Sequence, residues 1–194
     1  MSKARRRSSR RPLAAIVVWA AALAATALVA GQARQATPPA APGAAPVLVF
    51  ETAAKGTFQM QFFAADAPKS VEHLVGLVKQ NFYRGLRFHR AEARLVQIGD
   101  PQTRNVSLKN IWGTGNSGTP IGVSEVSRKH LHVRGAVGLA HGGNPAGADS
   151  QFYIMKSADT SLDGKYCVVG QVTAGMEVVD KIEVGDVLKQ VTIK

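Results

Sequence analysis

Cysteine is almost absent from this chain, since Cys167 is the only one among 194 residues. An intrachain disulfide is therefore excluded, and the lone thiol is interpreted as a small residue of a buried strand. The G-x-S-x-G elbow of many hydrolases is missing, and no histidine pair has zinc-site spacing backed by a third ligand. His130 and His132 would share one face of a strand, and they are interpreted as a surface pair. The sequence thus predicts neither a metal nor a cofactor.

Acidic residues are also scarce, with 13 Asp and Glu against 24 Lys and Arg, which gives a net charge of +11. Six of the basic residues lie within the first eleven positions, so about half of the excess charge belongs to the N-terminal end. No basic helix and no stripe of Lys or Arg with aromatic residues follows. Nucleic-acid binding is therefore not expected.

Long apolar runs are missing except near the N-terminus, where an uncharged stretch extends from Leu13 to Ala30. It follows the basic residues and precedes Gly31-Gln32-Ala33, whose small residues suit a signal peptidase. Residues 1–33 are therefore predicted to be a cleaved signal peptide. An uncleaved signal anchor is the alternative, because residues 13–30 are just long enough to span a bilayer and would tether the protein to a membrane. Both alternatives predict an exported protein of the periplasm or cell envelope.

Prolines without hydrophobic periodicity make residues 34–46 a linker, and the folded domain is expected over residues 47–194. Apolar patterns within it predict eight strands and two helices. The predicted strands are Val47–Thr52, Thr57–Phe63, Leu86–Arg90, Leu95–Ile98, Arg134–Ala140, Gln151–Met155, Cys167–Val172 and Gln190–Lys194, and the helices extend from Pro68 to about Asn81 and from Met176 to Ile182. Because regular helices do not separate the strands, the pattern favours an antiparallel sheet or barrel.

Several short motifs follow one another in a fixed order along this domain. They are Ala67-Pro68-Lys69-Ser70-Val71, Phe82-Tyr83-Arg84-Gly85-Leu86, Phe88-His89-Arg90, Gln97, Gly99-Asp100-Pro101, Arg134-Gly135-Ala136-Val137-Gly138, Ser150-Gln151-Phe152 and Leu162-Asp163-Gly164-Lys165. In this order the motifs resemble those of the cyclophilins, a family of peptidyl-prolyl cis-trans isomerases. The resemblance implies a mainly β fold, a closed eight-stranded antiparallel barrel capped by two α-helices, and we expect a monomer.

The family's reaction is rotation about X–Pro bonds, which is slow because amide resonance must be broken. A catalyst needs no nucleophile or metal for this reaction, only tighter binding of the twisted bond than of either planar isomer. The resemblance implies that Arg90 donates a hydrogen bond to the prolyl nitrogen and that Gln97 helps to orient Arg90. It assigns substrate binding to His89, Leu95, Ala140, His141, Gln151, Phe152, Tyr153, Leu162 and Tyr166. The expected partners are proline-containing segments of unfolded or exported proteins.

Two departures from the family pattern affect the proline pocket. The segment Ala91–Val96 is one residue shorter than usual and lacks the aromatic residue that floors the pocket, so Arg94 or Leu95 would stand nearest to it. A cation is a poor pocket floor, although its stem could pack while its charged head reaches water. Ser161 replaces a tryptophan that favours cyclosporin binding, and weak binding of that drug is expected.

A third departure concerns two aromatic positions. Tyr153 and Tyr166 stand where phenylalanine and histidine are frequent in the family, and both keep an aromatic body. Phe152 must face the opposite side of the strand from Tyr153, so we expect it to be a core residue even in a working enzyme. The altered pocket leaves a second hypothesis open, namely a catalytically weak peptide-binding or chaperone module.

Overall fold

The computed structural model describes residues 45–194 of the chain. The predicted signal peptide or anchor (1–33) and most of the predicted linker (34–46) lie outside the described residues. Within residues 45–194, no helix has the length and apolar character that crossing a membrane requires.

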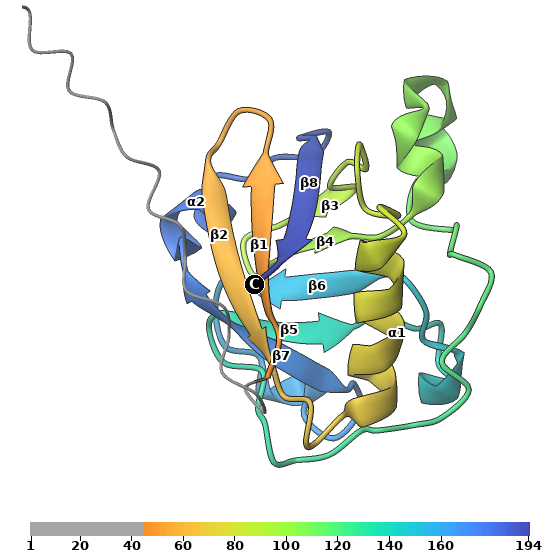
Figure 1. Ribbon diagram of the computed structural model, residues 1–194, viewed down its shortest axis with the longest axis vertical. Helices are drawn as coiled ribbons and strands as arrows, with labels where there is room; N and C mark the ends of the chain where they lie inside the picture. Colours follow the sequence, from red (N-terminus) through yellow and green to blue (C-terminus); the bar gives the residue numbers. More distant parts are fainter. Residues whose placement is uncertain (1–44) are drawn as a thin grey trace, which may run out of the picture. The chain divides into compact units, whose positions relative to one another are not determined.

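Eight antiparallel strands form one curled sheet in the order β3-β4-β6-β5-β7-β2-β1-β8 (Figure 1). The strands are β1 (Val47–Thr52), β2 (Thr57–Phe62), β3 (Arg90–Ala91), β4 (Leu95–Ile98), β5 (Ala136–Leu139), β6 (Phe152–Met155), β7 (Val168–Ala174) and β8 (Leu188–Ile193). Two α-helices, α1 (Pro68–Lys79) and α2 (Met176–Asp180), lie on opposite sides of the sheet in Figure 1. The prediction of a mainly β fold with eight antiparallel strands and two helices is confirmed.

The β1–β2 hairpin shows how the sequence pattern builds the core. Every second side chain is buried, including Leu48 and Phe50 on β1 and Phe58 and Met60 on β2. Phe50 and Phe58 are direct partners in the ladder, and their rings stack with centroids 4.6 Å apart. A pair of this kind adds about 0.5–1.5 kcal/mol to the stabilisation that comes from area burial alone.

The N-terminus of α1 is capped by a residue far away in the sequence. Pro68 occupies the first turn, where its missing N–H costs least. The Glu125 carboxylate accepts the backbone N–H groups of Lys69 at 2.9 Å and Ser70 at 2.8 Å. The buried face of the helix consists of side chains that pack into the main core: Val71, Leu74, Leu77 and Val78. The cap and this apolar face together fix α1 against the sheet.

The curled sheet is closed by a short contact between the segments that precede its two edge strands, β3 and β8. Arg87 forms an isolated bridge with Val187, and the backbone N–H of Phe88 donates to the carbonyl of Asp186 at 3.0 Å. The two edges of the curled sheet thus meet through an isolated bridge and a few hydrogen bonds, and not along a ladder between β3 and β8. The predicted strand over residues 86–90 is wrong in its extent, because only its last residue enters β3.

The interpretation of His130 and His132 as a surface pair is wrong. Neither residue lies in a strand, and His132 is only 1% exposed. The His130 ring stacks on Phe63 with centroids 3.7 Å apart, and its Nε2 lies 2.8 Å from Oδ2 of Asp66. The segment forms no regular strand, so the alternation expected of a strand does not apply to it. His130 and His132 contact different partners.

Candidate active site

A cavity of about 420 Å³ lies between the β3–β4 hairpin and the loops that follow β5 and β6. Its lining contains eight of the eleven residues that the sequence assigned to catalysis or substrate binding: Arg90, Leu95, Gln97, Ala140, His141, Tyr153, Leu162 and Tyr166. Four further residues line the cavity without having been assigned to the site: Glu92, Arg94, Asp159 and Ser161.

Three polar side chains form a row of hydrogen bonds that begins at the cavity. Arg90 and Gln97 are direct partners in the β3–β4 ladder, and Nη1 of Arg90 donates to Oε1 of Gln97 at 3.3 Å. Nε2 of Gln97 donates to Oε1 of Gln151 at 2.9 Å. Nε2 of Gln151 donates to the carbonyls of Gly113 and Gly115, at 2.9 and 2.8 Å. The loop at 113–115 therefore fixes the two amides, and these amides support one edge of the Arg90 guanidinium.

Glu92, which the sequence analysis missed, holds another edge of the same guanidinium. Its Oε1 lies 2.6 Å from Nε of Arg90, and its Oε2 lies 2.9 Å from Nη2. The hydrogen bonds from Arg90 hold the pKa of Glu92 below its ordinary value, so the carboxylate is charged at neutral pH. Glu92 lies in the turn just beyond β3, where no strand periodicity marks it in the sequence.

The apolar wall of the cavity belongs to a small buried cluster that is separate from the main core. In this cluster Leu95 packs with Tyr153, Ala140, Leu162 and Tyr166. Leu95 is 7% exposed, so it, rather than Arg94, supplies the apolar surface on the shortened segment. The shortened segment therefore still contributes an apolar side chain to the cavity wall.

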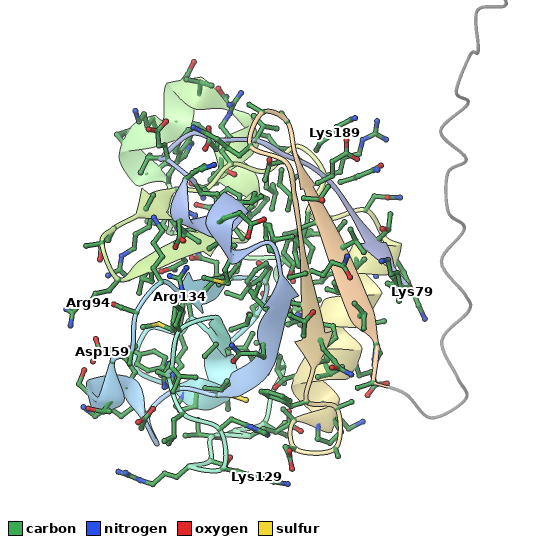
Figure 2. The ribbon with its side chains drawn as sticks, turned by 90° about the vertical axis from the view of Figure 1, so that its left-hand side faces the viewer. Lys79, Arg94, Lys129, Arg134, Asp159 and Lys189 are labelled. Atoms are coloured by element: carbon green, nitrogen blue, oxygen red, sulfur yellow. The ribbon has the colours of Figure 1, made fainter. Side chains whose placement is uncertain are left out.

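Arg94 and Asp159 form an ion pair at the rim of the cavity, and Figure 2 places both at the same edge of the domain. Nη1 of Arg94 lies 2.9 Å from Oδ2 of Asp159, and the Arg94 side chain is 66% exposed. The Ser161 hydroxyl donates to Oδ1 of Asp159 at 2.6 Å. This hydrogen bond is the main reason why the pKa of Asp159 is lowered. The cationic head thus reaches water, as a long side chain at a rim commonly does.

The hydroxyl of Tyr153 is held by a buried hydrogen-bond network beneath the cavity. It lies 2.8 Å from Nε2 of His132, and Nδ1 of His132 lies 2.8 Å from Oδ1 of Asp163. In a neutral ring protonated on Nδ1, which donates to the carboxylate, Nε2 accepts the hydrogen bond from the Tyr153 hydroxyl. A Cβ on Gly138 would lie 2.4 Å from the hydroxyl oxygen, so glycine leaves the room that the Tyr153 ring needs. Burial raises the pKa of Tyr153 far above its ordinary value, and the side chain stays a phenol.

A second cavity of about 300 Å³ adjoins the first, and Gln97, Ala140 and His141 line both. Gln151 lines this second cavity and not the first one. His141 stacks on Tyr166 with ring centroids 4.4 Å apart. Because they share these lining residues, the two cavities form one continuous surface with polar and apolar parts.

Phe152 and His89 line neither cavity, in contrast to their assignment to substrate binding. Phe152 packs in the main core, with its ring edge-on to Phe50 and Tyr83 at centroid distances of 5.9 and 5.5 Å. This is the position that strand alternation predicted for it. His89 has a buried Nδ1 without a hydrogen-bond partner, and burial lowers its pKa, so the ring is neutral at pH 7.

The described residues contain no cluster suited to a metal ion, and their one cysteine is not activated. Among residues 45–194, no group of three or more His, Cys, Asp or Glu side chains could hold a metal ion. Burial raises the pKa of Cys167 to about 11, so the thiol is protonated at neutral pH and is a poor nucleophile. The two adjoining cavities together present the Arg90 cation, the amides of Gln97 and Gln151, and an apolar wall.

A family model described as cyclophilin type peptidyl-prolyl cis-trans isomerase/CLD matches residues 47–194. This chain belongs to the cyclophilin family. A relative in Helicobacter pylori, named peptidyl-prolyl cis-trans isomerase, is 36% identical over 140 residues, which cover 71% of this chain and 80% of the relative. Peptidyl-prolyl cis-trans isomerase B of Bacillus subtilis is 32% identical over 136 residues, which cover 70% of this chain and 90% of the relative. The chain is therefore a cyclophilin-type peptidyl-prolyl cis-trans isomerase.

Solved cyclophilin structures share the fold. A cyclophilin type peptidyl-prolyl cis-trans isomerase of Cryptosporidium parvum has a TM-score of 0.67 at 21% identity, covering 77% of this chain and 98% of that one. A cyclophilin from Hirschia baltica has a TM-score of 0.59 at 19% identity, covering 75% of this chain and 73% of that one. At such low identities the likeness supports the cyclophilin fold alone.

Proposed function

We propose that the larger cavity receives the proline of an X–Pro segment and that Arg90 accelerates rotation about the preceding peptide bond. The observation that supports this is the lining of that cavity, which contains Arg90 together with the side chains of Leu95, Tyr153 and Leu162. The proline ring would pack against the apolar wall. Gln97 and Gln151 would steady Arg90 and contact the peptide backbone.

The chemistry follows from the electronic structure of the amide. Rotation breaks amide resonance, against a barrier of about 18–20 kcal/mol. In the twisted state the nitrogen lone pair is no longer delocalised, so it accepts a hydrogen bond that the planar amide nitrogen accepts poorly. Arginine stays protonated and offers rigid N–H donors, so it stabilises the twisted state selectively. Each 1.4 kcal/mol of such selective stabilisation accelerates rotation about tenfold.

Peptide binding at this cavity can be mapped directly. The Cryptosporidium parvum cyclophilin has also been crystallised in the presence of the dipeptide Ala-Pro. Titrating the ¹⁵N-labelled protein with a short Ala-Pro peptide should shift the amide signals of Leu95, Ala140, Tyr153 and Leu162, and leave those of the β1–β2 hairpin in place. The matched control is the same peptide with alanine in place of proline, which should cause far smaller shifts. Shifts centred elsewhere, or equal shifts with both peptides, would contradict the proposed site.

We also propose that the protein works outside the cytoplasm, as a monomer, on newly exported chains whose X–Pro bonds must reach the native isomer. The support is in the sequence, where a basic start precedes an uncharged stretch over residues 13–30 and a short run of small residues. Uncatalysed X–Pro isomerisation takes tens to hundreds of seconds, so proteins that refold after export gain from a catalyst. Residues 13–30 would either be removed with the signal peptide or remain as a membrane tether.

Export can be tested with a reporter that needs disulfides and is active only in an oxidising compartment, such as bacterial alkaline phosphatase. A fusion of residues 1–46 to the reporter should give active enzyme in the cell envelope. The matched control carries Val17→Arg and Leu23→Arg, which interrupt the apolar stretch and should keep the reporter inactive. An inactive native fusion, or equal activity from both fusions, would overturn the proposal. Membrane retention of the active fusion would separate the anchor from the cleaved peptide.

A further inference from the structure

The turn between β3 and β4 places an acidic residue beside the proposed catalytic arginine. Glu92 follows Arg90 by two positions, and its backbone N–H donates to the carbonyl of Leu95 at 2.8 Å. This hydrogen bond closes the short turn and fixes the backbone of Glu92. From this position, two residues after Arg90 and just beyond β3, the carboxylate reaches the Arg90 guanidinium.

The contacts of Arg90 leave a defined part of its guanidinium free. Glu92 accepts from Nε and Nη2 at 2.6 and 2.9 Å, and Gln97 accepts from Nη1 at 3.3 Å. A guanidinium has five N–H groups, so these three bonds leave one on each terminal nitrogen. The Glu92 carboxylate thus binds the Nε and Nη2 edge of the guanidinium, and the Gln97 amide binds Nη1. One N–H on each of Nη1 and Nη2 remains for a bound peptide.

The Arg90–Glu92 pair lies at the surface, so its effect is expected on the orientation of Arg90 more than on stability. The two side chains are 45% and 51% exposed, and ion pairs at such positions contribute little to folding. Arg90 is nonetheless a long, flexible side chain that must present its donors to one point. In the part of the chain that the structure describes, Glu92 is the only carboxylate paired with Arg90, and the neighbouring Arg94 is paired with Asp159.

We propose that Glu92 is a positioning residue of this isomerase, which holds the Arg90 guanidinium so that its free N–H groups face the prolyl nitrogen of the substrate. The proposal rests on the proposed role of Arg90. Glu92 itself does not touch the reacting bond. Its loss therefore lowers the fraction of bound peptide that meets a correctly oriented donor, without weakening the apolar wall that binds the proline.

Steady-state kinetics on an X–Pro peptide test this role. Glu92→Gln keeps one acceptor but loses the charge and the two-point contact, and it should lower kcat about three- to tenfold while KM changes less than about twofold. Glu92→Asp keeps the charge with a shorter reach and should fall between Gln and the native residue. The matched control is Glu183→Gln, which removes a surface ion pair with Lys55 (3.2 Å) away from the cavity and should leave kcat unchanged.

A second measurement follows the guanidinium itself. The ¹⁵Nε–H signal of Arg90 should exchange slowly with water in the native protein and quickly in Glu92→Gln. A native kcat in Glu92→Gln, a raised kcat, or fast Nε–H exchange in the native protein would each overturn the positioning role. Arg90→Ala separates the two proposals: if it loses activity while Glu92→Gln keeps it, only the positioning role fails. If Arg90→Ala stays active, the proposed function of Arg90 fails and the role of Glu92 fails with it.

Discussion

At the scale of single residues, the Tyr153 hydroxyl couples the cavity wall to the interior. The hydroxyl is hydrogen-bonded to His132, which is in turn hydrogen-bonded to the buried carboxylate of Asp163. Neither His132 nor Asp163 lines the cavity itself. The hydrogen bonds from His132 lower the pKa of Asp163, which keeps the carboxylate ionised at neutral pH. The network therefore fixes the ring that the proline would contact.

Removing that hydroxyl should cost stability. Tyr153→Phe leaves the buried Nε2 of His132 without a donor, so the free energy of unfolding should fall by about 1–3 kcal/mol. The free energy of unfolding can be measured by urea denaturation, with tryptophan fluorescence as the signal. Tyr166→Phe is the matched control, because that half-buried ring lines the same cavity and should change the value by less than about 0.5 kcal/mol. Equal effects of the two substitutions would show that the network does not hold Tyr153.

The sequence could predict most of the residues around the cavity but not their partners. The motifs that resemble the family's pointed to Arg90, Gln97 and Tyr153, and all three line the larger cavity. Glu92 was missed, because an acidic residue in a short turn has no periodicity that distinguishes it from an ordinary solvated side chain. His132 was misinterpreted, since a histidine's burial depends on a carboxylate that lies 31 positions further along the chain.

At the scale of elements, periodic segments were predictable and irregular ones were not. The strand over Leu95–Ile98 was predicted with its correct bounds, and α1 begins at the predicted proline. Residues 99–120 carry no repeating apolar pattern. Two buried carboxylates hold this stretch instead: Asp100 accepts the N–H groups of Gln102 and Gly113, and Asp149 accepts those of Gly118 and Thr119. Such contacts depend on the folded structure, which a single sequence does not reveal.

At the scale of the whole described domain, the site depends on long-range order. The order β3-β4-β6-β5 brings residues 90–97 next to residues 140–141 and 151–166, which are distant in sequence. Local patterns predicted eight strands but not this order, and only the family resemblance implied that the segments meet. Closure of the sheet by the Arg87–Val187 bridge was likewise not readable from apolar periodicity, because neither residue belongs to a strand.

The most direct test of the central claim is the rate of cis-trans isomerisation of a short X–Pro peptide, measured with the native protein and with Arg90→Ala. We expect clear catalysis by the native protein and a loss of about a hundredfold or more in kcat/KM on substitution, since one transition-state donor contributes about that factor. Arg90→Lys should fall in between, because it keeps the charge without the rigid fork. Native activity in Arg90→Ala would contradict the assignment. Absence of catalysis by the folded native protein would instead favour a peptide-binding module.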